Sequence, residues 1–325
     1  MATLSNKTID IIIPCYNSEE TIERALESLA EQTNRDFNVI IVDDGSSDKT
    51  VEVAEGCASK NGLSLITVTH EVNKGTAAAM NTGVSASAND WITFLGSDDR
   101  LDRSWLDDMI AVKEREPEYD VYACTAYLID TDGVSIHHKK GMDSGEIKLS
   151  DIYVRNMILS AGCFVKRQMF CDVGGFTVGM YNEDYDLWMR VLAKGYKIYE
   201  EINPLYYYYI GGEGQVTANQ RLIVSSSTIA RLNLIRSGLL NKSDIDGFTR
   251  GMHKCWRDLI VFEHSKYLNE KFKGCTSRIK NNFAQKVFNK SSDCARKIIL
   301  GLSLPAYNAQ ADKEIRKIDA ELNKS

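Results

Sequence analysis

The sequence predicts an α/β fold in which a Rossmann-like sheet is flanked by helices and followed by a helical C-terminal extension. Short apolar runs alternate with helical patterns four times within the first 100 residues, which is typical of parallel strands in one sheet. From about residue 219 the pattern becomes helical and basic, and no obvious strand follows. We therefore expect two regions, residues 1–218 and residues 219–325.

Most of the expected strands are short runs of branched or aromatic residues bounded by Gly, Pro, Asn or Asp. The runs in the N-terminal part are residues 9–13, 37–42, 63–68 and 91–95. Helical patterns follow them from about residues 18, 50, 76 and 102, and Ser18 is expected to cap the first helix. Later patterns favour strands at 121–124, 126–129, 158–165 and 206–210, a turn at 131–133 and a helix from about residue 183.

The composition is that of an ordinary soluble globular chain, with 43% hydrophobic and 26% charged residues. No apolar run approaches the ~20 residues needed to span a bilayer. The N-terminus lacks the basic and apolar regions of a signal peptide, so we expect a cytoplasmic protein. The eight cysteines include no CxxC pair, which favours reduced core thiols over a zinc site.

Charge is distributed unevenly along the chain. Up to residue 220 there are 19 Lys and Arg against 35 Asp and Glu, a net charge of −16, whereas the remainder carries 20 against 10, a net charge of +10. Residues 283–307 mix basic and apolar side chains, as in an amphipathic helix at the inner face of the cytoplasmic membrane. The alternative is a helix packed on the body with a solvated basic face. No nucleic-acid-binding motif accompanies the charge, so nucleic acid is not an expected partner.

Polar loops follow the first, second and fourth expected strands, where Tyr16-Asn17, Asp43-Asp44 and Asp98-Asp99 stand. In a parallel sheet these strand ends share one edge, so the loops are expected to converge on one crevice. An aromatic ring beside carboxylates suits a nucleobase and ribose, and adjacent carboxylates suit a divalent cation against a pyrophosphate. The alternative for both acidic pairs is an ordinary turn that caps the next helix. Neither GxGxxG nor GxxxxGK[ST] occurs in these loops.

Five short motifs occur in one order along the chain. They are IPCYN (13–17), VDDGSSD (42–48), NKG (73–75), GSDD (96–99) and EDYDLW (183–188). Together they resemble the family 2 glycosyltransferases, and the resemblance covers roughly residues 8–215. It implies a GT-A fold with a mixed sheet, and an inverting, nucleotide-sugar-dependent enzyme of hexosyltransferase type.

The resemblance also implies roles for residues on the donor side. Pro14 and Tyr16 would line the base pocket, and Asp44 would contact the uracil or other base. Lys74 would lie near the nucleotide or its phosphates. Asp98 and Asp99 stand where the family binds the donor and a divalent metal, Mn²⁺ or Mg²⁺.

On the acceptor side the resemblance makes Asp184 the catalytic base. That base takes a proton from an acceptor hydroxyl, which attacks the anomeric carbon opposite the leaving nucleoside diphosphate. At a helix N-terminus Asp184 is expected to stay ionised. Glu183 and Trp188 are expected on the acceptor side. The alternative for Trp188 is a core residue, and the alternative for Glu183, Asp184 and Asp186 is that they only interact favourably with the helix dipole.

Three departures from the family pattern concern the metal and the donor. Gly96 stands where an Asp is usual, Met80 stands near the place of a frequent Arg, and residues 211–216 contain no His. We expect an enzyme that uses a nucleotide sugar, a UDP-sugar first, and a glycan or lipid-linked glycan acceptor in surface polysaccharide biosynthesis. The alternative is a non-catalytic nucleotide-sugar-binding module. A nucleotidyltransferase is disfavoured because no Gly-rich basic phosphate loop lies near the N-terminus.

Overall fold

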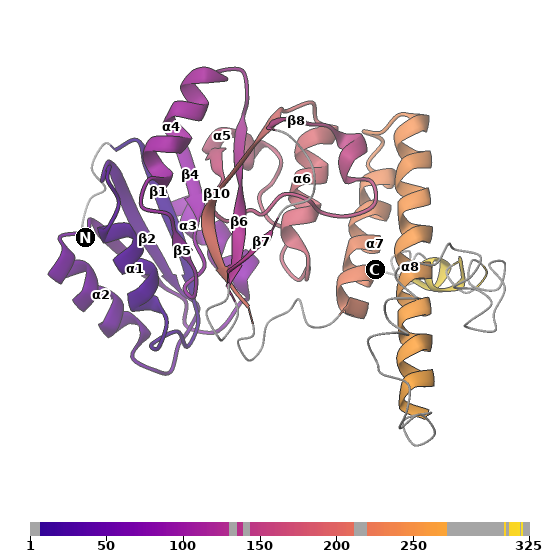
Figure 1. Ribbon diagram of the computed structural model, residues 1–325, viewed down its shortest axis with the longest axis horizontal. Helices are drawn as coiled ribbons and strands as arrows, with labels where there is room; N and C mark the ends of the chain where they lie inside the picture. Colours follow the sequence, from indigo (N-terminus) through magenta and orange to yellow (C-terminus); the bar gives the residue numbers. More distant parts are fainter. Residues whose placement is uncertain are drawn as a thin grey trace. The chain divides into compact units, whose positions relative to one another are not determined.

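The computed structural model describes residues 7–129, 135–138, 144–210, 220–271, 309, 312–318 and 320 (Figure 1). The chain divides into two compact units. The first, here called the sheet unit, comprises Met1–Ile152 and Asn156–Val216, and the second, the helical unit, comprises Tyr153–Arg155 and Thr217–Ser325.

Ten strands of the described residues form one mixed sheet, in the order β3-β2-β1-β4-β9-β6-β10-β5, with β7 beside β6 and β8 beside β10. The first four pair in parallel, as the sequence predicts, and β9 is antiparallel to both β4 and β6. The strands are β1 (Ile9–Cys15), β2 (Phe37–Asp43), β3 (Leu65–Thr69), β4 (Trp91–Phe94), β5 (Arg100–Leu101), β6 (Val121–Ile129), β7 (Ser135–His138), β8 (Gly145–Ile147), β9 (Phe164–Lys166) and β10 (Ile198–Tyr209).

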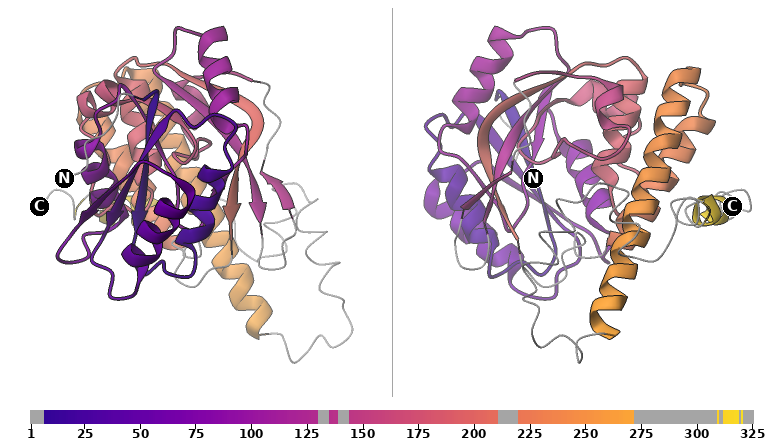
Figure 2. Two further views of the ribbon diagram at one scale, coloured as in Figure 1. Left: turned by 90° about the vertical axis from the view of Figure 1, so that its left-hand side faces the viewer. Right: turned by 45° about the vertical axis from the view of Figure 1, so that its right-hand side comes forward.

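Helices cover both faces of this sheet (Figures 1 and 2). Ile9, Ile11 and Ile13 of β1 join one core cluster with α1, α2 and α4. On the opposite face α3 packs on Ile12 so closely that a Cβ at Gly83 would lie 2.3 Å from the Ile12 side chain. The helices of this unit are α1 (Ile22–Ala30), α2 (Thr50–Asn61), α3 (Thr76–Ala86), α4 (Trp105–Arg115), the 3₁₀ helix η1 (Leu149–Ile152), α5 (Arg167–Asp172) and α6 (Glu183–Ala193).

Several predicted boundaries were wrong, for local reasons. β1 continues through Pro14, which lies beyond the last residue that pairs with β4, so its missing N–H removes no bond on that side. Ser18 does not cap α1, which begins at Ile22, because its hydroxyl instead lies 2.9 Å from that of Ser97. The strand expected at 158–165 is only β9, while the runs 121–124 and 126–129 form one strand, β6. The expected turn at 131–133 lies outside the described residues.

The helical unit contains α7 (Gln220–Arg236) and α8 (Lys242–Lys271), which pack side by side (Figure 2). Trp256 is buried between them and donates its indole N–H to the Thr228 hydroxyl (2.9 Å). The basic segment 283–307 lies outside the described residues. Within the described part of the chain, every helix is too short or too polar to serve as a bilayer span.

Candidate active site

The loops after β1 and β2 are joined by hydrogen bonds. The Asn17 N–H donates to the Ser46 hydroxyl, and the Ser47 N–H donates to the Asn17 side-chain oxygen, both at 2.9 Å. Asn17 has a φ of 49°, a left-handed conformation that Asn tolerates better than most residues. This turn leaves the Tyr16 side chain 51% exposed.

Asp44 connects the loop after β2 to the loop after β3. Its carboxylate accepts the N–H groups of Lys74 (2.9 Å) and Gly75 (2.7 Å), and His70 Nδ1 lies 2.6 Å from Oδ1. His70 in turn lies 2.9 Å from the Thr82 hydroxyl through Nε2. Asp44 is therefore both a sequence-predicted donor residue and the anchor of the loop that carries Lys74. Sequence reasoning missed His70, because nothing in its neighbours marks it as a partner of Asp44.

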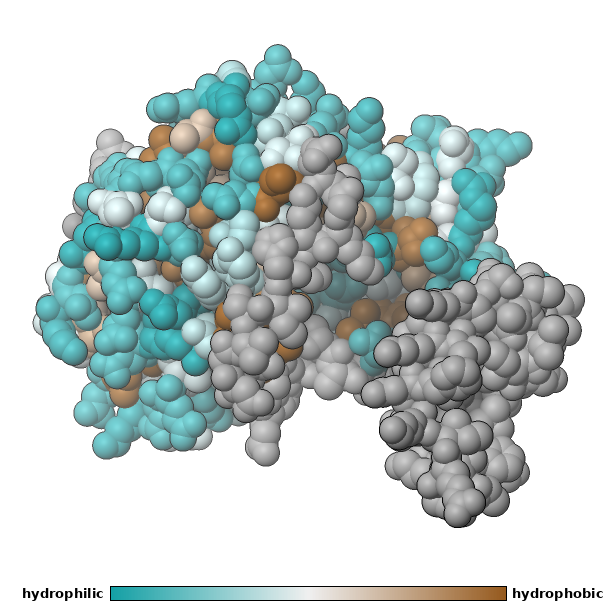
Figure 3. All heavy atoms as spheres, in the orientation of Figure 1, coloured by the Kyte–Doolittle hydropathy of each residue, from teal (hydrophilic) through white to brown (hydrophobic). Residues whose placement is uncertain are grey.

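Gly45 permits this close arrangement of loops. Its φ is +79°, and a Cβ there would lie 3.0 Å from the backbone carbon of Val72. Both features exclude most side chains. Val72 itself is 64% exposed and, with Tyr16, belongs to the few large apolar side chains on the described surface. The face in Figure 3 is otherwise mainly hydrophilic over the sheet unit, with hydrophobic residues in small groups.

Asp99, at the end of the β4 loop, is buried and held by β10. It accepts hydrogen bonds from the Tyr206 hydroxyl (2.6 Å) and the Tyr209 N–H (2.8 Å). Burial and the neighbouring Asp98 charge raise the pKa of Asp99 to about 7. Asp98 is only half-buried. The two carboxylates therefore differ. Asp99 joins the loop after β4 to β10 through hydrogen bonds, whereas the Asp98 carboxylate is more exposed and more open to a ligand.

Gly96 explains the shortened acidic motif. A Cβ at this position would lie 2.5 Å from Asp99 Oδ2 and 3.0 Å from Asp98 Oδ1. The space that an aspartate side chain would need is thus already filled by the two carboxylates that follow. The Gly96 N–H also donates to the Tyr206 hydroxyl (3.2 Å), which closes the turn on β10.

Arg24 of α1 brings a positive charge to the same loop. It donates to the Asp98 carbonyl, and its guanidinium lies 3.7 Å from the centroid of the Tyr209 ring. Its charge opposes the rise in the Asp99 pKa. The sequence offered no signal for Arg24, because its position in the first turn of an amphipathic helix is that of a solvated residue.

The acidic first turn of α6 carries the expected catalytic base. Asp184 accepts hydrogen bonds from the Asn156 side-chain amide and from the Tyr185 N–H, both at 2.7 Å. Burial and the adjacent Glu183 nevertheless raise the pKa of Asp184 to about 7, and burial raises the pKa of Glu183. Burial and the like charge of Glu183 thus act against the ionised form of Asp184 that its place at the helix N-terminus led us to expect.

Trp188 corrects a second expectation. Its side chain is completely buried, and its indole N–H donates to the Ile158 carbonyl (3.1 Å). The structure places it in the core, so the prediction of an acceptor-site wall was wrong. The neighbouring Asp186 is likewise structural, since it pairs with Arg190 (2.7 Å) and accepts from the Thr177 hydroxyl (2.6 Å).

Metal ligation depends on few side chains. In the part of the chain that the structure describes, His, Cys, Asp and Glu side chains form no group of three or more suited to a metal ion. Among the described residues, Asp98 and Asp99 offer adjacent hard oxygens in the loop after β4. A Mg²⁺-like cation that keeps waters and phosphate oxygens needs only one or two protein carboxylates, so the residues present fit such an ion.

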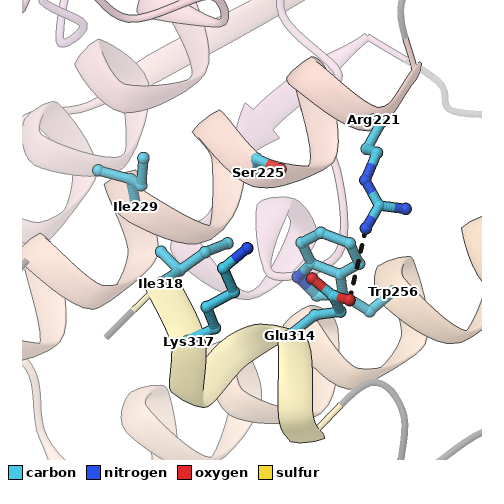
Figure 4. Close-up of a pocket in the computed structure, with 7 residues that line it drawn as sticks. All are labelled: Arg221, Ser225, Ile229, Trp256, Glu314, Lys317 and Ile318. Carbon is cyan, nitrogen blue, oxygen red and sulfur yellow. Dashed lines mark ion pairs between the residues drawn. The ribbon is translucent and has the colours of Figure 1, made fainter. Parts of the chain in front are cut away.

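A cavity of about 380 Å³ lies within the helical unit (Figure 4). Its polar wall contains Arg221, which pairs with Glu314 (3.4 Å) and lies over the Trp256 ring, 5.6 Å from its centroid. None of the sequence-predicted site residues lines it. The Arg221–Glu314 pair joins α7 to the 312–318 helix, and we assign the cavity no part in the chemistry.

The chain matches the model of the family described as glycosyl transferase family 2 over residues 10–174, about half its length. An uncharacterised glycosyltransferase of Haemophilus influenzae is 28% identical over 203 residues, which cover 61% of this chain and 67% of that protein. The amylovoran biosynthesis glycosyltransferase AmsB of Erwinia amylovora is 26% identical over 211 residues, covering 62% and 70%. The chain spans 35% to 67% of the length of the first curated relatives it matches.

Solved structures share the fold. TarS residues 1–349 of S. aureus, in complex with UDP-GlcNAc, align with a TM-score of 0.63 and 19% identity, over 98% of this chain and 92% of that one. The mannosyltransferase PcManGT of Pyrobaculum calidifontis, in complex with GDP-Man and Mn²⁺, aligns with a TM-score of 0.59 and 14% identity, over 98% and 87%. This chain belongs to glycosyl transferase family 2 and has a GT-A fold.

Proposed function

We propose that the protein is an inverting glycosyltransferase that moves a sugar from a nucleotide-sugar donor, a UDP-sugar first, to a glycan or lipid-linked glycan in surface polysaccharide biosynthesis. The observation that carries this proposal is the linked set of loops after β1, β2, β3 and β4, in the same unit as an acid pair with raised pKa values. The UDP-GlcNAc complex of TarS and the amylovoran role of AmsB support the donor and pathway classes.

On the donor side, the exposed ring of Tyr16 offers a stacking surface for the base, next to Pro14 at the end of β1. Asp44 contacts the base and at the same time holds the loop after β3 through two backbone N–H groups. That loop presents the exposed Lys74 side chain to the donor phosphates. The proposal therefore gives Asp44 a positioning role as well as a binding one.

On the acceptor side, Asp184 removes the proton of an acceptor hydroxyl while the hydroxyl oxygen forms a bond to the anomeric carbon. The bond from that carbon to the nucleoside diphosphate breaks on the opposite face, and the configuration inverts. A base is most effective when its pKa lies near the working pH, which the raised pKa of Asp184 satisfies. Glu183 lies beside it on the acceptor side and keeps that pKa high.

Asp98 and Asp99 would hold a divalent cation, Mn²⁺ or Mg²⁺, as the Mn²⁺ complex of PcManGT suggests. When bound, such an ion neutralises charge on the departing diphosphate. We assign the direct contact to Asp98, because both oxygens of Asp99 already accept hydrogen bonds from β10. Arg24 adds a fixed positive charge beside this loop.

A donor screen tests the proposal directly. The purified protein would be offered a panel of UDP-, GDP- and dTDP-sugars with an oligosaccharide or polyprenyl-diphosphate glycan, with and without Mn²⁺. We expect transfer from one donor class, with inversion at the anomeric carbon. Donor binding without transfer or hydrolysis, unchanged in Asp184→Asn, would instead support the non-catalytic binding module.

The basic C-terminal region is proposed to touch an anionic membrane, where a lipid-linked acceptor resides. Its net charge of +10 from residue 221 onward is the supporting observation. Co-sedimentation with vesicles of phosphatidylglycerol should exceed that with phosphatidylcholine and should fall as salt is added. Equal binding to both lipids would remove membrane contact from the proposal.

A further inference from the structure

The segment Tyr153–Arg155 belongs to the helical unit, although its neighbours on both sides in the chain belong to the sheet unit. The Tyr153 ring packs edge-on against Phe248 of α8, with centroids 4.9 Å apart. Its hydroxyl donates to Asp244 at 2.5 Å. Three consecutive residues are thus held by the helical unit, while the chain before and after them belongs to the sheet unit.

Helices α7 and α8 contact this segment through close packing at two glycines and through hydrogen bonds. A Cβ at Gly251 would lie 2.0 Å from the Tyr153 carbonyl oxygen, and one at Gly247 would lie 2.3 Å from the Tyr153 ring. The Val154 carbonyl accepts hydrogen bonds from Arg231 of α7 (2.6 Å) and from the Cys255 thiol of α8 (2.9 Å). Glycines in the middle of a helix cost stability, so their close packing here has a structural purpose.

The residues that flank the segment hold the first turn of α6. On one side, the Ile152 carbonyl accepts the hydrogen bond of the Tyr185 hydroxyl. On the other, the Asn156 amide donates to Asp184 at 2.7 Å, while the Asn156 oxygen accepts from the Ile158 N–H (3.1 Å). Asp184 and Tyr185 are consecutive, so both flanks act on the same turn.

We propose that Asn156 is a positioning residue for Asp184, and that the hold of α7 and α8 on Tyr153–Arg155 keeps Asn156 in place. Two peptide bonds join the segment to Ile152 and Asn156, the two residues that hold the first turn of α6. It rests on the proposed function, in which Asp184 is the base. The helical unit then serves catalysis by fixing a carboxylate with which its own helices need no contact.

Asn156 and the charged groups around Asp184 have opposite effects on the pKa of Asp184, so loss of Asn156 should change a measurable pH dependence. Within the described residues two titratable groups face this carboxylate, Glu183 on the same turn and the buried Cys163 thiol. Glu183 opposes ionisation of Asp184, and the Asn156 amide favours it by donating to the charged form. Loss of the amide removes a donor that neither neighbour can replace.

The first test is Asn156→Ala in the full-length enzyme. We expect kcat to fall about tenfold and the acid limb of its pH profile to move up by about one unit, as for one lost hydrogen bond to a charged group. The KM for the donor should stay unchanged. A fall in kcat without movement of the acid limb would contradict positioning of the carboxylate by Asn156.

The second test is Gly251→Ala, with Gly56→Ala of α2 as the matched control, since a Cβ at Gly56 meets nothing within 4 Å. Amide hydrogen exchange at the first turn of α6, including the Tyr185 N–H, should be about tenfold faster in Gly251→Ala than in the control. The acid limb of kcat should move in the direction seen for Asn156→Ala.

Tyr153→Phe, which removes the hydroxyl bond to Asp244 and keeps the ring, is the milder variant if Gly251→Ala does not fold, and a smaller rise in exchange is expected. Parental exchange at α6 in every folded variant of the segment would overturn the proposal. Exchange does not depend on turnover. If Asp184→Asn were as active as the parent, the proposed function would fail. The exchange rates would still show whether the contacts of Tyr153–Arg155 with α7 and α8 stabilise the first turn of α6.

Discussion

Two carboxylates of the sheet unit, Asp44 and Asp184, have contrasting surroundings. Asp44 is buried among the N–H groups of Lys74 and Gly75 and the ring of His70. Asp184 has two donors and a second acid beside it, and its pKa is raised. A carboxylate enclosed by donors holds loops in place, whereas one with fewer donors and a like-charged neighbour is suited to exchanging a proton.

Asp99 stands between these two cases. Its pKa is raised to about 7 like that of Asp184, but both of its oxygens are bonded to β10 and its side chain is buried. A raised pKa by itself therefore does not distinguish a base from a structural carboxylate. The two differ in exposure, since the Asp99 side chain is buried and Asp184 is partly exposed, which agrees with the proposed role of Asp184 as a base.

The largest expected effect is the loss of Asp184, the proposed base. Asp184→Asn keeps the shape of the side chain but cannot accept a proton, so kcat should fall about a thousandfold while donor affinity stays within a factor of two. Initial rates and calorimetric donor titration measure the two quantities. Glu52→Gln, which removes an exposed acid from the first turn of α2, is the matched control and should keep parental activity.

Asp44→Ala tests whether the Asp44 carboxylate holds the loops in place. This change removes the acceptor that three donors share, although the Gly75 N–H keeps its bond to the Asn73 side-chain oxygen, and we expect the free energy of unfolding to fall by about 3 kcal/mol. Denaturant unfolding measures this loss. Donor affinity should also weaken, because the loop carrying Lys74 is no longer anchored. Parental stability would show that water replaces the carboxylate without cost.

A smaller effect is expected where the acidic motif is shortened. Gly96→Ala places a Cβ 2.5 Å from Asp99 Oδ2, and we expect a loss of about 1–3 kcal/mol in the free energy of unfolding. Gly56→Ala, in open space on a helix, should instead be neutral or stabilising. If both variants unfolded at the same denaturant concentration, the close packing of the Gly96 turn would be disproved.

The smallest effect is expected in the pH dependence of the parent enzyme, where kcat should fall tenfold for each pH unit below the pKa of Asp184. Only ionised Asp184 accepts a proton, and its pKa is raised to about 7, so kcat should fall below about pH 7 and level off above it. Steady-state rates between pH 5 and 9 measure this limb. A profile already level at pH 5 would mean that Asp184 is ionised as readily as an exposed aspartate.

Much of the fold could be predicted from local pattern. Alternating apolar runs and helical patterns identified the parallel strands β1 to β4, and the polar residues after them identified loops that the structure joins by hydrogen bonds. The short strand β9 was overestimated, because an apolar run that packs as irregular backbone looks the same in sequence as a strand. The extent of a strand depends on its neighbours, which a local pattern does not contain.

The sequence by itself determined which residues stand at strand ends and at the start of α6, because those positions follow from periodicity within a few residues. Tertiary structure alone decided their partners: His70 for Asp44, Tyr206 for Asp99 and Asn156 for Asp184 are 26, 107 and 28 residues away in the chain. It also decided that Trp188 is core and that the pKa of Asp184 is raised. Burial and pairing arise where distant segments pack together, so no local pattern encodes them.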